Sequence, residues 1–160
     1  MIIKSFNVIS DTHGLAKDKL EKLISLFNQA DLLVFLGDGL SDIAKIEDKV
    51  TCPIIKVKGN CDLISGAQRE VVIETQCGKI LFVHGHDHRV KSSLLDLCYY
   101  AMEKGCSYVY YGHTHVASVD VYSGVTMVNP GSLGSPRLAK SSFCSVIEDR
   151  GQFSSKIVFV

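Results

Sequence analysis

Histidines and carboxylates are concentrated in a few short stretches of this chain. All six histidines lie in three groups, Asp11-Thr12-His13, His84-Gly85-His86-Asp87-His88 and His113-Thr114-His115. Two further polar pairs, Gly37-Asp38 and Gly59-Asn60, each follow a short apolar run. Imidazole nitrogen combined with carboxylate and amide oxygen, without thiolates, favours hydrolytic ions such as Mn, Fe, Ni or Zn over a Cys-type structural zinc. The residue types therefore indicate a metal centre.

The number of candidate ligands is larger than one ion needs. The seven candidates are Asp11, His13, Asp38, Asn60, His84, His113 and His115. Two ions roughly 3.5–4 Å apart, sharing one carboxylate and a water, would use all of them and would match the two-metal arrangement of phosphoester hydrolases. Taken singly, Gly37-Asp38 or Gly59-Asn60 would be read as an ordinary turn. The hypothesis rests on their occurrence together with the histidine groups.

Strands are expected directly before these polar groups. Apolar, β-branched-rich runs predict strands over 2–9, 32–36, 54–58, 79–83 and 107–111. Helical spacing predicts helices over about 15–30, 41–48 and 90–104. The β-α-β-α-β order of the first third implies parallel strands with right-handed crossovers. Sites in such sheets form outside the carboxyl ends of the strands, where the candidate ligands stand.

The second half of the chain has a different pattern. Residues 70–74 and 79–83 flank Gly78 as a predicted hairpin, and 116–121, 125–128, 142–147 and 153–160 are predicted to be short antiparallel strands. Residues 129–136 form a turn-rich loop, and no linker or repeat is visible. We therefore expect one α/β domain over 1–160, with two mixed β-sheets packed face to face and helices on the outer faces.

Composition restricts the class of protein. Of 160 residues, 46% are hydrophobic and 21% charged, which is typical of a globular chain with its own core. Seventeen basic residues balance seventeen acidic ones, so we expect no nucleic-acid patch and no attachment to a membrane surface. The six cysteines are isolated, and neither a signal peptide nor a membrane-spanning stretch is evident, which favours the cytoplasm. A homo-oligomer is possible on this composition.

The ordered motifs Asp11-x-His13, Gly37-Asp38, Gly59-Asn60, His84-Gly85-His86 and Gly112-His113-x-His115 resemble those of the calcineurin-like metallophosphoesterases. The chain is most similar to their small bacterial and archaeal phosphodiesterase branch, which is related to the retromer scaffold subunit Vps29. The resemblance implies a four-layer sandwich. It also implies one divalent ion on Asp11, His13 and His115, with Asp38 bridging to a second ion on Asn60, His84 and His113. Mn or Ni is favoured, with Zn, Fe or Mg as alternatives.

One position departs from the family pattern. Most relatives carry a histidine after Gly-Asn, as proton donor to the leaving group, with a carboxylate next to it; here Cys61 and Asp62 follow. Cys61 either fills space or takes part in the chemistry, as a poorer proton donor than imidazolium. We count Asn60, Cys61, Asp62 and His86 as candidate catalytic residues. Asn60 would contact a phosphate oxygen, and His86 would do the same or orient His84.

Two other side chains, Arg137 and His88, have simpler alternative roles. Arg137 is either a contact for a substrate phosphate or part of a surface ion pair. His88 matches no motif, and we expect it to be a solvated surface histidine.

The function implied by the resemblance is a metal-dependent phosphodiesterase. It would hydrolyse a small phosphodiester or nucleotide-like substrate through a hydroxide activated by two metal ions. A phosphomonoesterase is the second enzyme hypothesis, and the missing histidine at position 61 argues mildly against it. The non-enzymatic alternative is a Vps29-like protein-binding scaffold with an idle metal site.

Overall fold

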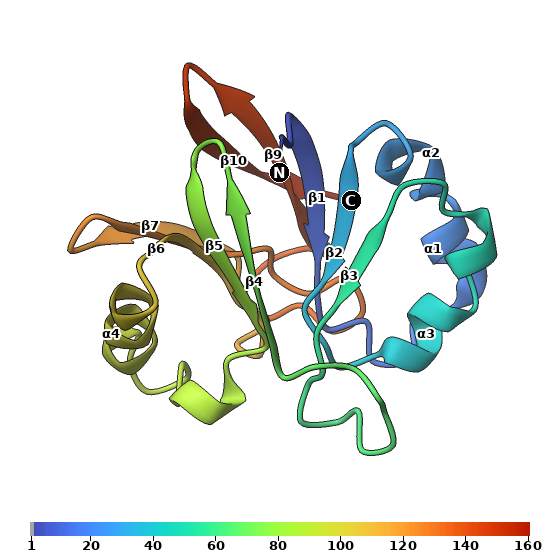
Figure 1. Cartoon of the computed structure of the whole chain (residues 1–160). Coiled ribbons are helices and arrows are strands. Elements are labelled where there is room, and N and C mark those ends of the chain that lie inside the picture. The colour runs from blue at the N-terminus through green and yellow to red at the C-terminus, as the bar shows by residue number, and fades with distance from the viewer. Residues whose placement is uncertain (1) are drawn as a thin grey trace.

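A computed structural model of the protein describes residues 2–160 and contains two five-stranded sheets (Figure 1). The expectation that the chain has no signal peptide involves Met1, which lies outside these residues. The first sheet has the order β10-β9-β1-β2-β3. Its strands are β1 (Ser5–Ile9), β2 (Leu32–Phe35), β3 (Ile54–Lys56), β9 (Ser142–Asp149) and β10 (Gln152–Phe159). As predicted, β1, β2 and β3 are parallel, and β9 and β10 complete the sheet as antiparallel strands.

The second sheet has the order β4-β5-β6-β8-β7. Its strands are β4 (Glu70–Thr75), β5 (Gly78–Val83), β6 (Cys106–Tyr110), β7 (Ser118–Tyr122) and β8 (Val125–Asn129). The predicted hairpin of β4 and β5 is confirmed. The expectation that 125–128 would be antiparallel to its neighbours is half wrong, because β8 pairs antiparallel with β7 but parallel with β6. Met127 and Val128 are fully buried on opposite faces of β8, which suits a central strand.

Short helices cover the outer faces of both sheets. On the first sheet lie α1 (Lys17–Glu21), α2 (Ile24–Phe27), α3 (Leu40–Ala44) and the 3-10 helix η1 (Glu47–Lys49). On the second lies α4 (Leu95–Glu103), and the 3-10 helix η2 (His86–His88) follows β5 at the edge of that sheet (Figure 1). The single helix expected over 15–30 is wrong, because a turn in which the Leu23 N–H bonds to Leu20 O divides it into α1 and α2. The helix expected from about residue 90 begins only at Leu95, after turns stabilised by the Arg89 carbonyl.

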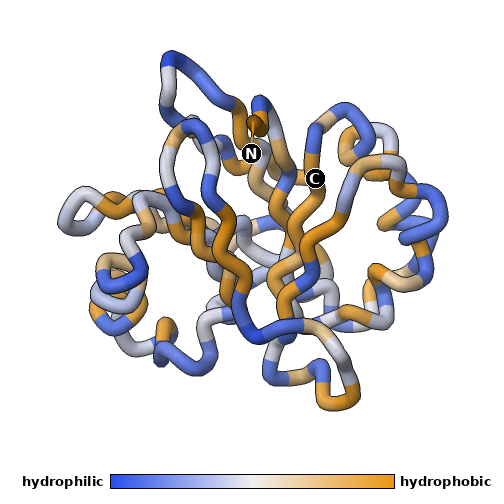
Figure 2. Tube along the Cα trace, in the orientation of Figure 1, coloured by the Kyte–Doolittle hydropathy of each residue, from blue (hydrophilic) through white to orange (hydrophobic). Residues whose placement is uncertain are grey.

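The two sheets and the helices outside them make four layers, and the apolar core fills the three spaces between these layers. Between the sheets, Phe6 is fully buried and meets the rings of Phe82, Tyr110 and Phe153 edge-on, with centroid distances of 6.1, 5.3 and 5.3 Å. A second cluster packs α4 on the second sheet, and a third packs α1 to α3 on the first. Figure 2 shows the apolar residues following the strands, with polar residues in the outer loops. The predicted two-sheet sandwich with outer helices is confirmed.

The strands that precede the candidate ligands end at one common edge. The carboxyl ends of β1, β2, β3, β5 and β6 point to the lower edge of the molecule in Figure 1, where η2 and the loop after β3 lie. An isolated parallel bridge between Val57 and Gln68 ties the two sheets together there. No helix among residues 2–160 is long and apolar enough to cross a membrane.

Candidate metal centre

Five of the seven predicted ligands have a left-handed backbone. Their φ angles are 54° for Asp11, 43° for His13, 60° for Asp38, 70° for His113 and 60° for His115. This conformation is uncommon for residues other than glycine, and it persists only where the surrounding structure enforces it. Its repeated occurrence at the ends of strands from both sheets marks this edge as the candidate functional site.

The glycines of the Gly37-Asp38 and Gly59-Asn60 pairs are explained by close packing of the two turns. Gly37 has a φ of 102°, and a Cβ placed on it would collide with the backbone nitrogen of Gly59. A Cβ on Gly59 would in turn collide with Asp38. The turn after β2 and the turn after β3 can therefore approach one another only because both carry glycine, and this approach brings Asp38 to the loop that holds Asn60.

The two buried aspartates use their carboxylate oxygens in the same way. Oδ2 of Asp11 accepts the Ser10 hydroxyl and the backbone N–H of His113, at 2.5 and 3.0 Å. Oδ1 of Asp38 accepts the backbone N–H of Cys61 at 2.7 Å. The remaining oxygens, Asp11 Oδ1 and Asp38 Oδ2, face histidines instead. One oxygen thus fixes each carboxylate while the other points into the site.

Six side chains form two groups of three around these free oxygens. The groups are Asp11, His13 and His115, and Asp38, His84 and His113, and within each the potential ligand atoms lie within 4.8 Å of one another. Oδ2 of Asp38 is 3.3 Å from Nε2 of His84 and 3.7 Å from Nε2 of His13. Asp38 therefore lies between the two groups, as a bridging carboxylate would.

Hydrogen bonds outside the cluster fix two of the imidazoles. Nδ1 of His84 donates to the carbonyl of Leu36 at 2.8 Å, and Nδ1 of His115 donates to the carbonyl of Ser135 at 2.6 Å. Because a carbonyl oxygen only accepts, Nδ1 carries a proton in both rings, and Nε2 is the nitrogen directed into the site. This is the usual arrangement that orients a metal-binding histidine.

The protonation states suit a cation. Burial alone raises the pKa of Asp11, but His115 and His84 beside it outweigh burial and hold that pKa below its usual value. Burial likewise raises the pKa of Asp38, and His84 and the Cys61 N–H bring it well below its usual range. Burial, reinforced by His84, lowers the pKa of His113 to about 4. At neutral pH the carboxylates are ionised and His113 is neutral, the states in which these groups bind metals. Asp11 raises the pKa of His115, and Asp38 and Asp11 outweigh burial to raise the pKa of His84, so a metal ion would take the place of a proton on these two rings.

One specific observation indicates that these donors suit divalent ions. Oδ1 of Asp11 is buried and has no hydrogen-bond partner among the described residues, although Nε2 of His115 and of His13 lie 3.2 and 3.5 Å away. The two Nε2 atoms of His13 and His115 are themselves only 3.0 Å apart. A buried carboxylate oxygen without a hydrogen bond is costly unless a cation, either a metal ion or a protonated imidazole, lies beside it. Nitrogen and oxygen donors of this kind suit Mn, Ni, Zn or Fe.

Asp62 lies beneath the site and holds its turns together. Its Oδ2 accepts the backbone N–H groups of Asp38 and Gly59, at 2.7 and 2.9 Å. Its Oδ1 accepts those of Gly39 and Leu40, at 2.9 and 3.0 Å. Both oxygens are therefore occupied by backbone donors, which favours a positioning role over a direct role in the reaction.

Asp42 holds the loop of Thr12 and Gly14 in the same way, and its role was not predicted from the sequence. Its Oδ2 accepts the Thr12 hydroxyl at 2.7 Å and the backbone N–H of Gly14 at 2.8 Å, and Lys45 pairs with its Oδ1 at 3.0 Å. The residue is almost fully buried at the start of α3. Nothing in the local sequence distinguishes it from an ordinary polar residue of a helix.

Asn60 and Cys61 are both exposed at the mouth of the site. Asn60 Nδ2 lies 3.5 Å from Cys61 Sγ, and that sulfur belongs to a group with His13 and Asp38 in which ligand atoms lie within 4.8 Å of each other. Partial burial and the adjacent Asp38 raise the pKa of the Cys61 thiol. The thiol is thus close to the metal ligands and protonated at neutral pH.

The other predicted contacts lie at the periphery. The ring of His86 is 5.4 Å from that of His84, with Asp87 3.5 Å from its Nε2. Arg137 is exposed and donates its backbone N–H to the carbonyl of His115 at 3.1 Å. His88 is outside the cluster but is not simply solvated, because its ring packs 4.6 Å from that of Tyr100 and is half-buried.

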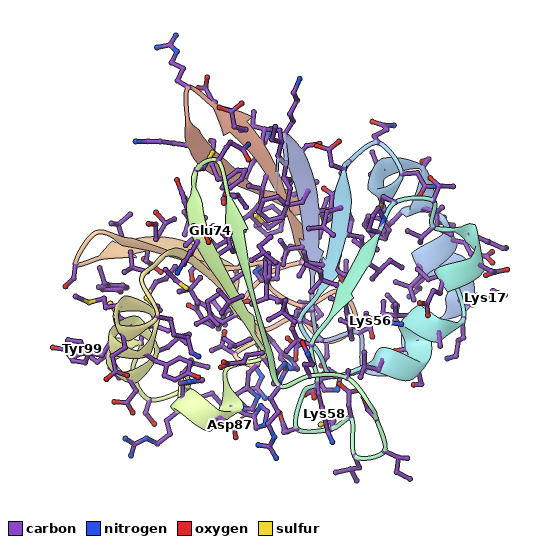
Figure 3. The ribbon with its side chains drawn as sticks, viewed as in Figure 1. Lys17, Lys56, Lys58, Glu74, Asp87 and Tyr99 are labelled. Carbon is purple, nitrogen blue, oxygen red and sulfur yellow. The ribbon has the colours of Figure 1, made fainter. Side chains whose placement is uncertain are left out.

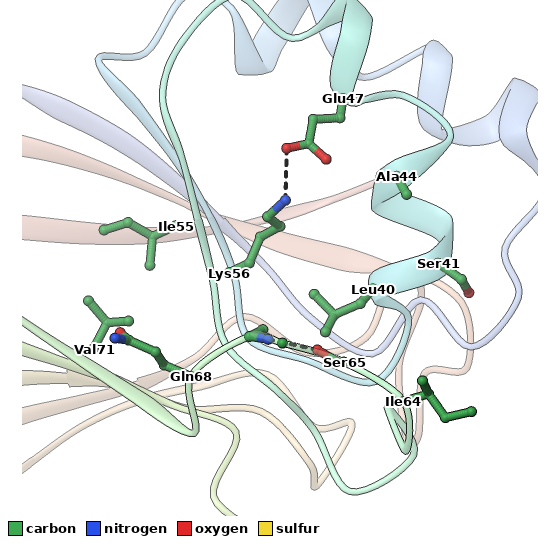
Figure 4. A pocket seen from close by; sticks show the side chains of 12 residues that line it. Leu40, Ser41, Ala44, Glu47, Ile55, Lys56, Ile64, Ser65, Gln68 and Val71 are labelled. Atoms are coloured by element: carbon green, nitrogen blue, oxygen red, sulfur yellow. Dashed lines mark hydrogen bonds and ion pairs between the residues drawn. The ribbon is translucent and has the colours of Figure 1, made fainter.

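One groove lies away from these ligands. It has a volume of about 780 Å³ and lies between α3, β3 and the loop 64–68 (Figure 4). Its charged lining residues, Lys56 and Glu47, pair with each other at 2.7 Å. A smaller pocket of about 330 Å³ adjoins the metal centre and includes Asn60 and His86 in its lining. Of the two, the smaller pocket is the one that lies next to the candidate metal ligands.

Comparison with known proteins agrees with this geometry. The calcineurin-like phosphoesterase superfamily domain matches residues 5–150. The chain therefore belongs to this superfamily, as its motifs predict. A probable metallophosphoesterase of Bacillus subtilis, YsnB, is 33% identical over 143 residues, which cover 88% of this chain and 81% of that protein.

Solved structures share the fold over nearly the whole chain. A predicted phosphoesterase from Streptococcus pneumoniae has a TM-score of 0.83 at 27% identity, covering 99% of this chain and 91% of that one. Likeness in fold extends to Entamoeba histolytica Vps29 complexed with Zn²⁺, with a TM-score of 0.75 at 20% identity and coverage of 96% and 98%. It also extends to an archaeal phosphodiesterase, with a TM-score of 0.74 at 19% identity and coverage of 96% and 99%.

Proposed function

We propose that this protein is a metal-dependent phosphodiesterase that hydrolyses a small phosphodiester or nucleotide-like substrate. The observation that carries the proposal is the unpaired buried Oδ1 of Asp11, surrounded by the Nε2 atoms of His13 and His115. The second group has a similar arrangement, because the Nε2 atom of His84 faces the carboxylate of Asp38. These ligand atoms support a metal site, and turnover separates an enzyme from a scaffold that carries an idle one.

The proposed ligand assignment follows the two groups. Asp11, His13 and His115 hold the first ion, and Asp38 bridges to a second ion held by Asn60, His84 and His113. Two bound divalent ions would supply a water of lowered pKa and would neutralise phosphate oxygens. Mn²⁺ or Ni²⁺ is favoured for this set of nitrogen and oxygen donors.

The remaining side chains bind and orient the substrate. The exposed amide of Asn60 donates to a phosphate oxygen, and His86 either makes a second such contact or orients His84. Asp62 holds the turns that present Asp38 and Asn60. Arg137, whose backbone N–H bonds to the His115 carbonyl, would contact a phosphate oxygen from the His115 side of the site.

The diester preference rests on Cys61. A protonated thiol of raised pKa beside Asp38 is a weak proton donor, so the site gives little help to a poor leaving group. Monoesters of simple alcohols need that help most. A diester with a good leaving group, or a proton delivered by His86 or solvent, suits the site better. The archaeal phosphodiesterase of the same fold provides a precedent for diester chemistry.

Hydrolysis of two chromogenic substrates tests the proposal. Protein stripped with a chelator and resupplied with Mn²⁺, Ni²⁺, Mg²⁺ or Zn²⁺ should hydrolyse bis-p-nitrophenyl phosphate faster than p-nitrophenyl phosphate. Asp38→Asn should abolish this turnover, whereas His88→Ala, outside the cluster, should retain it. A faster rate on the monoester would favour a phosphomonoesterase. Absence of metal-restored turnover on both substrates would favour the Vps29-like scaffold.

A further inference from the structure

Two cations are brought together at the junction of the two sheets. The parallel bridge between Val57 and Gln68 is reinforced by the Lys58 N–H, which donates to the Gln68 carbonyl at 2.8 Å. The residues that follow the bridge on its two strands, Lys58 and Arg69, therefore stand side by side where β3 ends and β4 begins. The local sequence around Lys58 and Arg69 does not predict a binding role for either residue.

Both cations line the pocket beside the metal centre. The pocket has a volume of about 330 Å³ and is lined by Lys58, Gly59, Asn60, Leu63, Arg69, His86 and Asp87. Gly59 packs against Asp38, and the ring of His86 lies 5.4 Å from that of His84 and 6.1 Å from that of His113. The pocket thus opens directly beside the second group of metal ligands.

The charge of the pocket is incompletely balanced. Nη1 of Arg69 donates to both carboxylate oxygens of Asp87, at 3.2 and 3.1 Å, which orients the guanidinium but leaves Nε and Nη2 without a partner among residues 2–160. Asp87 is the single carboxylate of the lining, against the two cations Lys58 and Arg69. Figure 3 shows Lys58 and Asp87 at the lower edge of the molecule, below strands of the two sheets. A net positive pocket that presents free guanidinium donors suits an anion.

We propose that Lys58 and Arg69 form a subsite for a second phosphate group of the substrate, next to the phosphate that is hydrolysed. A guanidinium held from one side by Asp87 offers its remaining N–H donors to phosphate oxygens, and the lysine adds a second charge. Asn60 and His86 connect this subsite to the metal centre. The inference rests on the proposed function for the position of the reacting phosphate, and it narrows the substrate class to compounds with at least two phosphates.

Binding of three nucleotides to the protein supplied with Mn²⁺ tests the subsite without turnover. AMP carries one phosphate, α,β-methylene ADP carries a second one adjacent to the first, and adenosine 3′,5′-bisphosphate carries a second one on the far side of the sugar. We expect one of the two ligands with a second phosphate group to bind at least about tenfold more tightly than AMP in calorimetric titration, as one to two charge-assisted hydrogen bonds would give. The better of the two reports whether the second phosphate is joined directly or through an organic spacer.

The variants Arg69→Ala and Lys58→Ala should reduce this advantage to less than about threefold and leave the AMP affinity unchanged. Arg150→Ala is the matched control, because Arg150 also lies beside an aspartate, Asp149, but at the distant turn between β9 and β10. The ion pair of Arg69 is exposed, so its loss should leave the fold intact. Equal affinity for all three nucleotides in the wild type, or an undiminished advantage in Arg69→Ala, would overturn the subsite.

The outcome is separable from that of the proposed function. Arg69-dependent binding of a bisphosphate in a protein that hydrolyses neither chromogenic ester would leave the subsite standing and overturn the enzymatic proposal. Metal-dependent hydrolysis of bis-p-nitrophenyl phosphate with no preference for bisphosphates would do the reverse.

Discussion

The carboxylate of Asp62 accepts the backbone N–H of Asp38 at 2.7 Å, so the loop after β3 holds the turn after β2 in place. Three more backbone N–H groups, those of Gly39, Leu40 and Gly59, bond to the same carboxylate. These bonds hold the turn in which Asp38 has its left-handed conformation and faces His84. A residue that touches neither the proposed ions nor the substrate thus shapes the bridging ligand.

Asp62→Asn should therefore weaken both the fold and the metal site. An amide offers one acceptor oxygen and turns an NH₂ group toward backbone donors, so we expect the free energy of unfolding to fall by about 2 kcal/mol. Urea denaturation of the metal-free protein measures this loss, and Mn²⁺ affinity should fall in parallel. Asp149→Asn, at an exposed position on β9, is the control and should change neither quantity. Unchanged stability and affinity in Asp62→Asn would show that the turns hold their shape without this carboxylate.

Cys61→His should restore a proton donor to the leaving group. The position lies at the mouth of the site, next to Asn60 and within reach of Asp38, so an imidazole there can reach a departing oxygen. We expect kcat/KM for an alkyl phosphodiester to rise by about a hundredfold, a typical contribution of a general acid, with a smaller effect on bis-p-nitrophenyl phosphate. Cys61→Ser, which keeps the size without the imidazole, should show no such gain. A drop in activity in both variants would mean that the thiol itself is required.

Glu70→Gln should change the pH dependence of stability. Glu70 accepts the Tyr100 hydroxyl at 2.6 Å and pairs with Lys104 at 2.9 Å, which ties β4 to α4. Burial alone raises the pKa of Glu70, but these two partners outweigh burial and hold that pKa below its usual value of about 4.3. A lowered carboxyl pKa stabilises the fold fully above the unfolded value, and this stability is lost as the pH falls through that value toward the folded one.

The wild type should consequently lose more unfolding free energy between pH 6 and pH 3 than Glu70→Gln does. Urea titrations at several pH values measure the difference. Glu103→Gln, on the exposed side of α4, should follow the wild-type curve. Parallel curves for Glu70→Gln and the wild type would remove Glu70 from this account.

Much of the fold and the outline of the site could be predicted from the sequence, because both depend on local patterns. Buried apolar runs identified the strands, and the polar residues directly after them identified the edge where the ligands gather. The helix over 15–30 was mispredicted because apolar spacing does not reveal the turn at Leu23. The parallel position of β8 depends on which strand is buried on both faces, which only the packed sheet decides.

The residues that the sequence could not identify act through contacts between distant segments. Asp42 holds the loop of Thr12 and Gly14 from another element, and its own neighbours give no sign of that role. Lys58 and Arg69 meet only because the two sheets join at Val57 and Gln68. The family motif points to the carboxylate at Asp62, but its four backbone bonds become apparent only in three dimensions.

The number of metal ions bound per chain tests the central claim most directly. Protein stripped with a chelator, dialysed against excess Mn²⁺ and analysed by elemental mass spectrometry should contain about two ions per chain. His115→Ala and His113→Ala should each retain about one, because each removes a ligand of only one group, whereas His88→Ala should retain two. One ion or none in the wild type, or two ions in both ligand variants, would contradict the two-ion site.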